Sequence, residues 1–365
     1  MMGIKPLCMG LVFLCVTIQC TERKKTIDSN QEYQLISPDH KGLVYSGRID
    51  FSNPKEPILY WAGTSVAATF QGTTIRVKLE DNGENYYKAI IDGDAAGAIE
   101  IDCHAGANTY TVADHLEDRP HTIELVRRTD STSPATKFLG FLIERNGHLL
   151  ESPTNDRLKI EFYGNSITSG HGVLDESGEN NDNRTTWDNY YAYGAITSRA
   201  LNADYRCISM SGIGIIKSWY PLTMPEMYNR LNPNDKNSRW DFALWTPDVV
   251  VINLFQNDSW LIEQMDPVPK EKEIIDVYKN FVSIIRGHYP EASVFCVLGN
   301  MSAAEEGSPW PGYVESAVGQ LRDLGEKNLF PLIFPYRKTK AHPTVVEQKE
   351  MADMLASYIK TTLKI

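Results

Sequence analysis

Side chains that together could carry out nucleophilic chemistry are spread along this chain, and the first of them is Ser166. It follows an alternating, partly apolar run that leads into Gly164-Asn165-Ser166, and a helix-compatible stretch begins only later, near Trp187. Gly164 permits a sharp turn at the carboxyl end of a strand, where side chains would otherwise crowd. A serine at such a turn projects its hydroxyl above the sheet edge at which open α/β sheets bind ligands. Taken alone, the segment could also be a strand-to-loop turn with an incidental serine, so the rest of the chain decides.

Three later segments supply partners for this serine, and they contain Gly212, Asn257 and His342. The first two follow apolar β-like runs, and the third precedes the final helical pattern. Elements that end at one edge of a sheet can converge on one site. A hydroxyl, a backbone N–H, a side-chain amide and an imidazole are the groups that acyl transfer by serine requires.

The general base in such a site would be a histidine, because an imidazole can accept and return a proton near neutral pH. We predict that His342 is this base. His171, five residues after Ser166, is the alternative. It could instead contact substrate, support the site, or be an ordinary polar loop residue.

The ordered segments resemble the four blocks of the SGNH (GDSL-type) hydrolase superfamily. The run 164–168 is similar to its Gly-Asp-Ser-Ile block, with Asn165 in the place of aspartate. Ser211-Gly212 resembles the second block, and Asn257-Asp258 resembles the end of the Gly-x-Asn-Asp block, with Phe255 in the place of glycine. With a β-rich segment ahead of these blocks, the chain from about residue 35 onward is most similar to carbohydrate esterase family 2.

This resemblance implies an N-terminal all-β sandwich with jelly-roll-like connections, followed by a three-layer α/β SGNH hydrolase domain with a parallel sheet. It implies a carboxylic ester hydrolase of the acetyl xylan esterase type, which removes O-acetyl groups from plant polysaccharides or oligosaccharides such as xylan and glucomannan. Ser166 and His342 would be catalytic, and the N–H groups of Ser166 and Gly212 with the amide of Asn257 would form the oxyanion hole. The alternatives are a glycan-binding lipoprotein that has lost turnover, and a lipase or thioesterase of the same superfamily.

One departure from the superfamily pattern concerns the base. The pattern near the histidine is Asp-x-x-His, and here Thr339 stands in the place of the aspartate. Threonine cannot carry the charge that would orient and stabilise a protonated imidazole. The resemblance to family 2 favours a Ser-His dyad in which a backbone carbonyl holds the imidazole; a carboxylate from elsewhere, or loss of activity, are the alternatives.

Aromatic residues in the expected loops are candidates for binding a sugar ring. Trp260 and Trp310 are predicted to contact substrate, and Trp187 is a further candidate, although each could instead pack in the core. The long stretches 175–189 and 220–245 could shape the cleft, and surface decoration is the alternative for each. The sequence contains no metal-, nucleotide- or calcium-binding motif of the common spacings, so no cofactor is expected.

Charge and the N-terminal segment limit the partners and the location. The net charge of −11 and the pI near 5.3 argue against nucleic acid as a partner. Residues 1–19 are predicted to be a signal peptide, and Cys20 to be the lipid-bearing residue of a bacterial lipoprotein in the cell envelope, with residues 20–32 as the tether. Simple secretion is the alternative, because Gln19 is a poor match to the small residue expected there. A membrane is then contacted only through this anchor.

The pattern along the rest of the chain predicts two domains, over 33–150 and 156–365. In the first, short β-rich runs are separated by Asn-Gly and Asp-Gly dipeptides at 82–83, 92–93 and 146–147, which suit tight hairpins. In the second, buried strands at 247–254 and 293–298 alternate with helical patterns at 270–288 and 343–360. Three cysteines remain beyond Cys20 without paired spacing, so no disulfide framework is expected.

Overall fold

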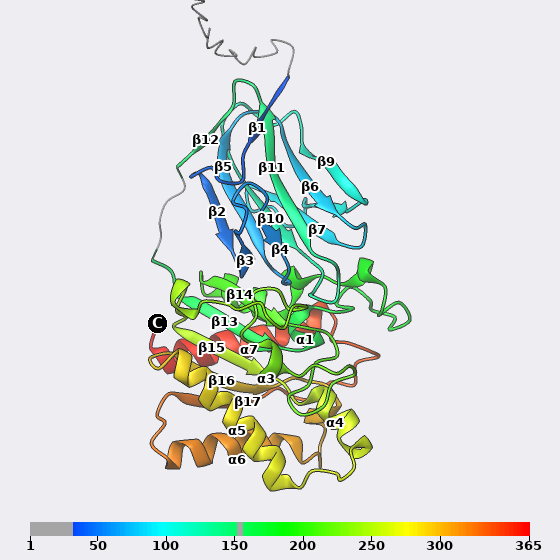
Figure 1. Ribbon diagram of the computed structural model, residues 1–365, viewed down its shortest axis with the longest axis vertical. Helices are drawn as coiled ribbons and strands as arrows, with labels where there is room; N and C mark the ends of the chain where they lie inside the picture. The colour runs from blue at the N-terminus through cyan, green and yellow to red at the C-terminus, as the bar shows by residue number, and fades with distance from the viewer. Residues whose placement is uncertain (1–31, 152–155) are drawn as a thin grey trace, which may run out of the picture. The chain divides into compact units, whose positions relative to one another are not determined.

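The computed structural model describes residues 32–151 and 156–365. These form two antiparallel sheets, followed by one parallel sheet with helices on both faces (Figure 1). Residues 33–365 make up one compact unit. In the described ranges, no helix is both long enough and apolar enough to cross a bilayer. The predicted signal peptide, Cys20 and the tether up to residue 31 lie outside the described residues.

The N-terminal part is a β-sandwich of two six-stranded sheets whose pairings are all antiparallel between named strands. In order, the first sheet contains β3 (Ile49–Asp50), β4 (Ile58–Leu59), β11 (Thr136–Glu144), β6 (Ile75–Asp81) and β9 (Gly106–Ala113), with β1 (Tyr33–Ile36) also paired to β11. The second contains β12 (His148–Leu150), β5 (Ser65–Gln71), β10 (Pro120–Arg127), β7 (Tyr86–Ile91) and β8 (Ile99–Asp102), with β2 (Leu43–Ser46) also paired to β5. Phe70, Phe138 and Phe141 are fully buried in the core of this sandwich.

The glycine-containing dipeptides of the sandwich do not form the tight hairpins that were predicted. Residues 82–83 and 146–147 each join strands that belong to different sheets, β6 to β7 and β11 to β12. Residues 92–93 begin a longer connection from β7 to β8. Gly83 has a φ of +87°, and Asp92 and Gly93 have φ of +51° and +73°. These residues therefore do adopt the left-handed conformation, but they use it to cross between sheets or to enter a loop and not to close a tight hairpin.

The C-terminal part is built on a five-stranded parallel sheet. Its order is β14 (Asp204–Ser209), β13 (Lys159–Gly164), β15 (Val249–Asn253), β16 (Ser293–Leu298) and β17 (Leu329–Ile333). Alternate residues of β15 enter different cores, Val250 and Ile252 on one face and Val249 and Val251 on the other. A strand with both faces covered requires such a continuous apolar run, which is why its position could be predicted.

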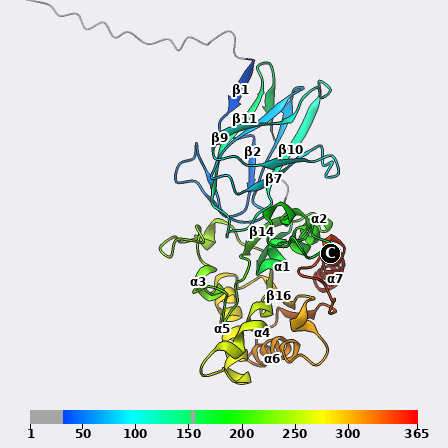
Figure 2. The same ribbon diagram turned by 90° about the vertical axis from the view of Figure 1, so that its right-hand side faces the viewer.

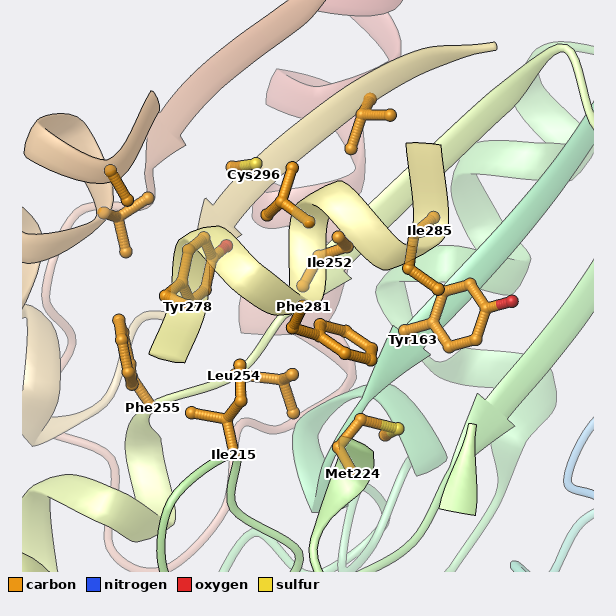
Figure 3. Packing of buried hydrophobic residues seen from close by; sticks show 14 of the residues in the cluster. Tyr163, Ile215, Met224, Ile252, Leu254, Phe255, Tyr278, Phe281, Ile285 and Cys296 are labelled. Atoms are coloured by element: carbon orange, nitrogen blue, oxygen red, sulfur yellow. The ribbon is translucent and has the colours of Figure 1, made fainter. Parts of the chain in front are cut away.

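Helices cover both faces of this sheet. They are α1 (Ser166–Ser169), α2 (Tyr193–Ala200), α3 (Met224–Met227), α4 (Gln256–Leu261), α5 (Glu271–His288), α6 (Trp310–Asp323) and α7 (Val345–Leu363), with short 3₁₀ turns at Arg184–Thr186, Asn189–Tyr191, Phe242–Leu244, Ile262–Gln264 and Ser302–Ala304. The apolar sides of α5 and α6 pack on one face, and those of α2 and α7, which lie side by side (Figure 2), pack on the other. Figure 3 shows Tyr278 and Phe281 from α5 packed with Ile252 and Cys296 from the sheet.

The predicted fold class is confirmed, since antiparallel sheets precede a parallel sheet with helices. The closing helix begins slightly later than predicted. Thr344 is its N-cap and forms a capping box with Glu347, so Pro343 precedes the helix instead of lying in its first turn. A hydroxyl that accepts a free N–H at the helix start decides the boundary here.

Candidate active site

Ser166 is the first residue of α1, directly after the turn that ends β13. The one-turn helix begins at the serine itself, whereas the sequence favoured a helix only near Trp187. Asn165 is its N-cap, with Oδ1 accepting the N–H of Ile167 at 3.1 Å. A Cβ atom on Gly164 would lie 2.0 Å from Oγ1 of Thr168, so only glycine allows α1 to fold back this closely. The turn therefore depends on the close approach of α1 to Gly164, and it leaves Ser166 only 5% exposed.

The register of the sheet brings the predicted segments to one edge. Gly164 at the end of β13 is paired with Ser209 at the end of β14 on one side and with Asn253 at the end of β15 on the other. The loop containing Gly212 follows β14, and α4 containing Asn257 follows β15. The segments thus leave adjacent strands at the same level, as expected for an open α/β sheet.

His342 lies against Ser166 from the loop before α7. Its Nε2 is 2.8 Å from Ser166 Oγ. This is hydrogen-bond distance between a candidate base and a candidate nucleophile. The two residues, which are 176 positions apart, are therefore brought together as the sequence predicted.

The other ring nitrogen of His342 does not contact the group that was expected. Nδ1 is 2.7 Å from Nδ2 of Asn181, a side-chain amide, where a backbone carbonyl or a carboxylate was anticipated. Thr339 donates its hydroxyl hydrogen to the backbone carbonyl of His342 at 2.7 Å, so it supports the loop and does not touch the ring through this bond. Asn181 was missed because one asparagine in a polar loop gives no signal in the sequence.

His171, the alternative base, is stacked behind His342. Their ring centroids are 4.4 Å apart, and the other side of His171 packs on Trp187 with centroids 4.0 Å apart. Nδ1 of His171 is 3.0 Å from Ser211 Oγ, and its Nε2 is 3.4 Å from a carboxylate oxygen of Asp182. His171 therefore supports the base, and its polar contacts are with Ser211 and Asp182 and not with Ser166.

The surroundings of His342 favour the neutral imidazole. Burial among neighbouring atoms, and secondly the nearby ring of His171, lower the pKa of His342 to about 3. Burial also lowers the pKa of His171, although Asp130 and Asp182 oppose this. A neutral ring at physiological pH is the form that can accept a proton from serine.

Two of the predicted oxyanion donors are placed by specific contacts. Gly212 has a φ of +83°, and its carbonyl accepts the N–H of Trp219 at 3.1 Å. Asn257 uses one side-chain N–H on the carbonyl of Ile213 at 2.8 Å, and its Oδ1 accepts from Trp219 Nε1 at 3.2 Å. The amide orientation is thereby fixed, and its second N–H remains for a ligand.

Asp258, next to Asn257, stabilises a neighbouring loop. Its carboxylate accepts the N–H groups of Ile215, Ile216 and Lys217 at 2.7–3.1 Å, while burial raises the pKa of this group. It therefore holds the loop that follows Gly212 and is not the missing acid beside the histidine.

The predicted tryptophans differ in exposure. Trp260 is 42% exposed, and its Nε1 donates to Ser302 Oγ at 2.8 Å. Trp310 is only 6% exposed and packs on Phe255 with ring centroids 5.0 Å apart, so the prediction that it contacts substrate is corrected: it is a core residue. Trp219, which the sequence reasoning missed, is 61% exposed while bonded to Asn257.

Residues of the sandwich also reach the site. The carboxylate of Asp130, in the loop after β10, accepts the N–H of Ser211 at 2.7 Å. Arg128 donates to the carbonyls of Thr185 at 2.7 Å and Trp187 at 3.1 Å. The sandwich thus holds both the loop that carries Gly212 and the loop that carries Asn181. Within the described ranges, no group of three or more His, Cys, Asp or Glu side chains is placed to hold a metal ion.

Comparison with known proteins identifies the family to which this chain is similar. Residues 45–153 match the family model described as "Carbohydrate esterase 2 N-terminal". A curated relative, the cellulase/esterase CelE of Acetivibrio thermocellus, is 31% identical over 91% of this chain, which spans about two fifths (41%) of that protein. An acetylxylan esterase/glucomannan deacetylase of Cellvibrio japonicus is 26% identical over 91% of this chain and 94% of its own length.

The similar solved structures also include a family two carbohydrate esterase. The structure of a family two carbohydrate esterase from Clostridium thermocellum in complex with cellohexaose has a TM-score of 0.81 and 32% identity, and the match covers 88% of this chain and 99% of that chain. The match includes the sandwich as well as the parallel sheet. Because the similarity extends over nearly the whole of that esterase, the chain belongs to carbohydrate esterase family 2.

Proposed function

We propose that this protein is a serine esterase that removes O-acetyl groups from plant polysaccharides or their oligosaccharides. The observation that carries the proposal is the 2.8 Å distance between Nε2 of His342 and Oγ of Ser166. The relatives named as acetylxylan esterase/glucomannan deacetylase support xylan and glucomannan as substrates. A neutral base in contact with the hydroxyl argues against a protein that only binds glycans.

In the proposed reaction, Ser166 Oγ attacks the carbonyl carbon of the acetyl ester while its proton moves to Nε2 of His342. The carbonyl oxygen becomes an oxyanion, which accepts hydrogen bonds from the N–H groups of Ser166 and Gly212 and from the amide of Asn257. Collapse breaks the bond to the sugar oxygen, and that oxygen takes the proton from Nε2. A water molecule then attacks the acetyl-serine and gives one proton to His342. The bond to Oγ breaks, Oγ takes that proton from Nε2, and acetic acid leaves and loses its remaining proton to solvent to give acetate.

The sugar side of the site is proposed to include Trp219 and Trp260. Trp219 combines 61% exposure with a hydrogen bond to Asn257, so its ring lies beside an oxyanion donor. An exposed aromatic face next to the reacting groups is suited to packing against a sugar ring. Trp260 is a weaker candidate, since its ring is bonded to Ser302 instead of to a donor of the site.

The test is acetate release from acetylated xylan and acetylated glucomannan by the wild type, Ser166→Ala and His342→Ala. We expect release by the wild type, and loss of at least about 1,000-fold in each variant with unchanged circular dichroism. Acetate release that survives Ser166→Ala contradicts the mechanism. Absence of acetate release from both substrates favours the glycan-binding alternative. Acetyl and long-chain nitrophenyl esters, compared in parallel, distinguish this esterase from a lipase or thioesterase.

The location is also a proposal, and it rests on the sequence alone. Residues 1–19 are proposed to be removed as a signal peptide and Cys20 to carry the lipid, so that the enzyme is tethered in the bacterial cell envelope. Mass spectrometry of the mature N-terminus tests this directly. Partition of the wild type into detergent, and of Cys20→Ala into the aqueous phase, is the expected result; an unmodified wild type in the aqueous phase would indicate simple secretion.

A further inference from the structure

We infer that Asn181 is a positioning residue that fixes the tautomer of His342, in the role that an aspartate has in the related Ser-His-Asp arrangement. This inference rests on the proposed function, because it concerns the base of the same reaction. The orienting group would then come from the loop after α1, far in the sequence from position 339, where Thr339 stands in the place of the aspartate of the pattern.

The contact between these two side chains is close and specific. The amide of Asn181 is 2.7 Å from Nδ1 of His342, on the opposite side of the ring from Ser166. Among the described residues, no other side chain or carbonyl is hydrogen-bonded to Nδ1. The amide is therefore the group that determines whether Nδ1 carries a proton.

The chemistry of the base then selects one orientation of the amide. To accept the proton of Ser166, Nε2 must be unprotonated, so the neutral ring must carry its hydrogen on Nδ1. An N–H at Nδ1 needs an acceptor, and Oδ1 is the accepting end of the Asn181 amide. If Nδ2 faced Nδ1 instead, the ring would carry its hydrogen on Nε2 and could not take the proton of the serine.

The surroundings of Asn181 allow the same orientation. With Nδ2 beside Nδ1, Oδ1 is a buried acceptor without a hydrogen-bond partner. A buried acceptor without a hydrogen-bond partner is destabilising. A half-turn of the amide, whose two ends have nearly the same shape, brings Oδ1 to the N–H at Nδ1, while Nδ2 takes the place that Oδ1 had. An amide also serves as the orienting group in Cys-His-Asn sites.

The surrounding loop holds Asn181 in place. Its backbone carbonyl accepts the N–H of the Trp187 ring at 2.8 Å, and Trp187 is in turn stacked on His171. Gly172 has a φ of +62°, and a Cβ atom there would lie 1.9 Å from Oδ1 of Asn181. Thus the backbone approaches the amide as closely as glycine allows, and the amide has little freedom to leave the ring.

The experiment compares Asn181→Ala, Asn181→Leu and Asn181→Asp with the wild type, measuring kcat and KM for a soluble acetylated xylo-oligosaccharide from pH 3 to 9. The Nδ1–H···Oδ1 bond gains strength when the ring becomes charged, so we expect kcat to fall about 10- to 100-fold in the alanine and leucine variants, with KM nearly unchanged. Leucine keeps the volume but not the acceptor. A leucine variant with wild-type kcat overturns the inference.

Asn181→Asp gives a readout that a merely structural residue would not. A carboxylate facing Nδ1 stabilises the imidazolium, so the acid limb of kcat/KM should move to higher pH by about 1 to 3 units. His171 is the ionisable group that otherwise acts on His342, while Asp182 and Asp130 face His171. Asn180→Asp adds the same charge at the exposed neighbouring residue and should leave the limb in place. An acid limb that moves equally in both aspartate variants overturns the inference.

A measurement that does not need turnover separates this inference from the proposed function. The ¹⁵N chemical shifts of the His342 ring report which nitrogen carries the hydrogen. We expect the Nδ1–H tautomer in the wild type and in Ser166→Ala, and a mixture of tautomers in Asn181→Ala. An Nε2–H tautomer in the wild type overturns the role of Asn181, whether or not acetate is released; loss of acetate release with the Nδ1–H tautomer intact counts only against the proposed function.

Discussion

At the residue scale, the base of the site is an uncharged imidazole between two uncharged partners. Ser166 contacts one ring nitrogen and Asn181 the other, and His171 is stacked on the ring. None of these groups supplies the negative charge that would raise the basicity of the ring. Burial therefore dominates and holds the pKa of His342 near 3, well below the usual value of 6.5.

This lowered pKa predicts how the rate depends on pH. Above its pKa the ring is neutral and can act as a base, and below it the ring is protonated and inactive, so kcat/KM in the free enzyme follows the neutral fraction. We expect kcat/KM to be nearly constant from pH 7 down to about pH 5. Initial rates, with circular dichroism at each pH as the control for acid unfolding, test this. An acid limb near pH 6.5 with the fold intact would contradict it.

The residue scale also shows which part of the site the sequence could predict. Ser166 follows from a local signal, a strand ending in a glycine turn, and His342 from the resemblance to the superfamily pattern, whose histidine precedes the last helix. Asn181 does not, because its partner is 161 positions away and only folding brings them together. Trp310 was assigned to the substrate because a tryptophan in a core and one in a cleft look alike in the sequence.

At the element scale, the junction of β15 and α4 contains a strained residue. Phe255 has a φ of +80°, at the position where the superfamily pattern has glycine, and its side chain is fully buried. Its ring packs on Tyr278, with ring centroids 4.8 Å apart (Figure 3), and on Trp310, with ring centroids 5.0 Å apart. The left-handed conformation costs a non-glycine residue about 1–2 kcal/mol, which burial of the ring offsets.

We predict an inverted order of stability for two substitutions at this junction. Removing a buried phenylalanine ring typically destabilises a protein by about 3–5 kcal/mol, so both Phe255→Gly and Phe255→Ala should unfold at lower urea concentration than the wild type. Glycine also relieves the backbone strain, so Phe255→Gly should be more stable than Phe255→Ala by about 1 kcal/mol. Urea unfolding measures this. The opposite order, as found for ordinary helix positions, would show that the backbone is not strained here.

At the scale of the whole molecule, the sandwich and the parallel sheet share a buried ion pair and the walls of the site. Arg48, after β2, contacts Glu161 on β13 at 3.1 Å, and both side chains are fully buried. Glu161 also accepts hydrogen bonds from Tyr163 at 2.5 Å and Tyr289 at 2.9 Å. With Asp130 on the N–H of Ser211, these contacts join the sandwich to the parallel sheet within the compact unit of residues 33–365.

The buried ion pair predicts a non-additive effect on stability. Arg48→Met leaves Glu161 buried without its charge partner and should lower the free energy of unfolding by about 3–5 kcal/mol. Arg48→Met combined with Glu161→Gln removes both charges and should be more stable than Arg48→Met alone. Urea unfolding of the wild type, both single variants and the double variant tests this cycle. Additive losses would mean that the two charges act independently.

The contact from Asp130 predicts that the sandwich affects turnover. Asp130→Ala frees the N–H of Ser211, so the next peptide, which carries the Gly212 N–H, loses its support. A small misplacement of a catalytic group can lower the rate by about 10- to 100-fold, and we expect such a fall in kcat without loss of folding. Glu117→Ala, which removes an exposed carboxylate of the sandwich (its side chain is 84% exposed), is the matched control. Equal rates for both variants would show that the sandwich does not support the oxyanion site.

The unusual acidity of the His342 ring has a consequence for the chemistry of the surroundings. Hydrolysis of an acetyl ester at neutral pH yields acetate and a proton, so each turnover of the proposed reaction releases acid beside the enzyme. A histidine with an ordinary pKa would become protonated there, and the acid produced would progressively inhibit the enzyme. With the pKa of His342 lowered to about 3, we expect this inhibition to be weak, so that acetate release should not slow as the pH falls from 7 to about 5.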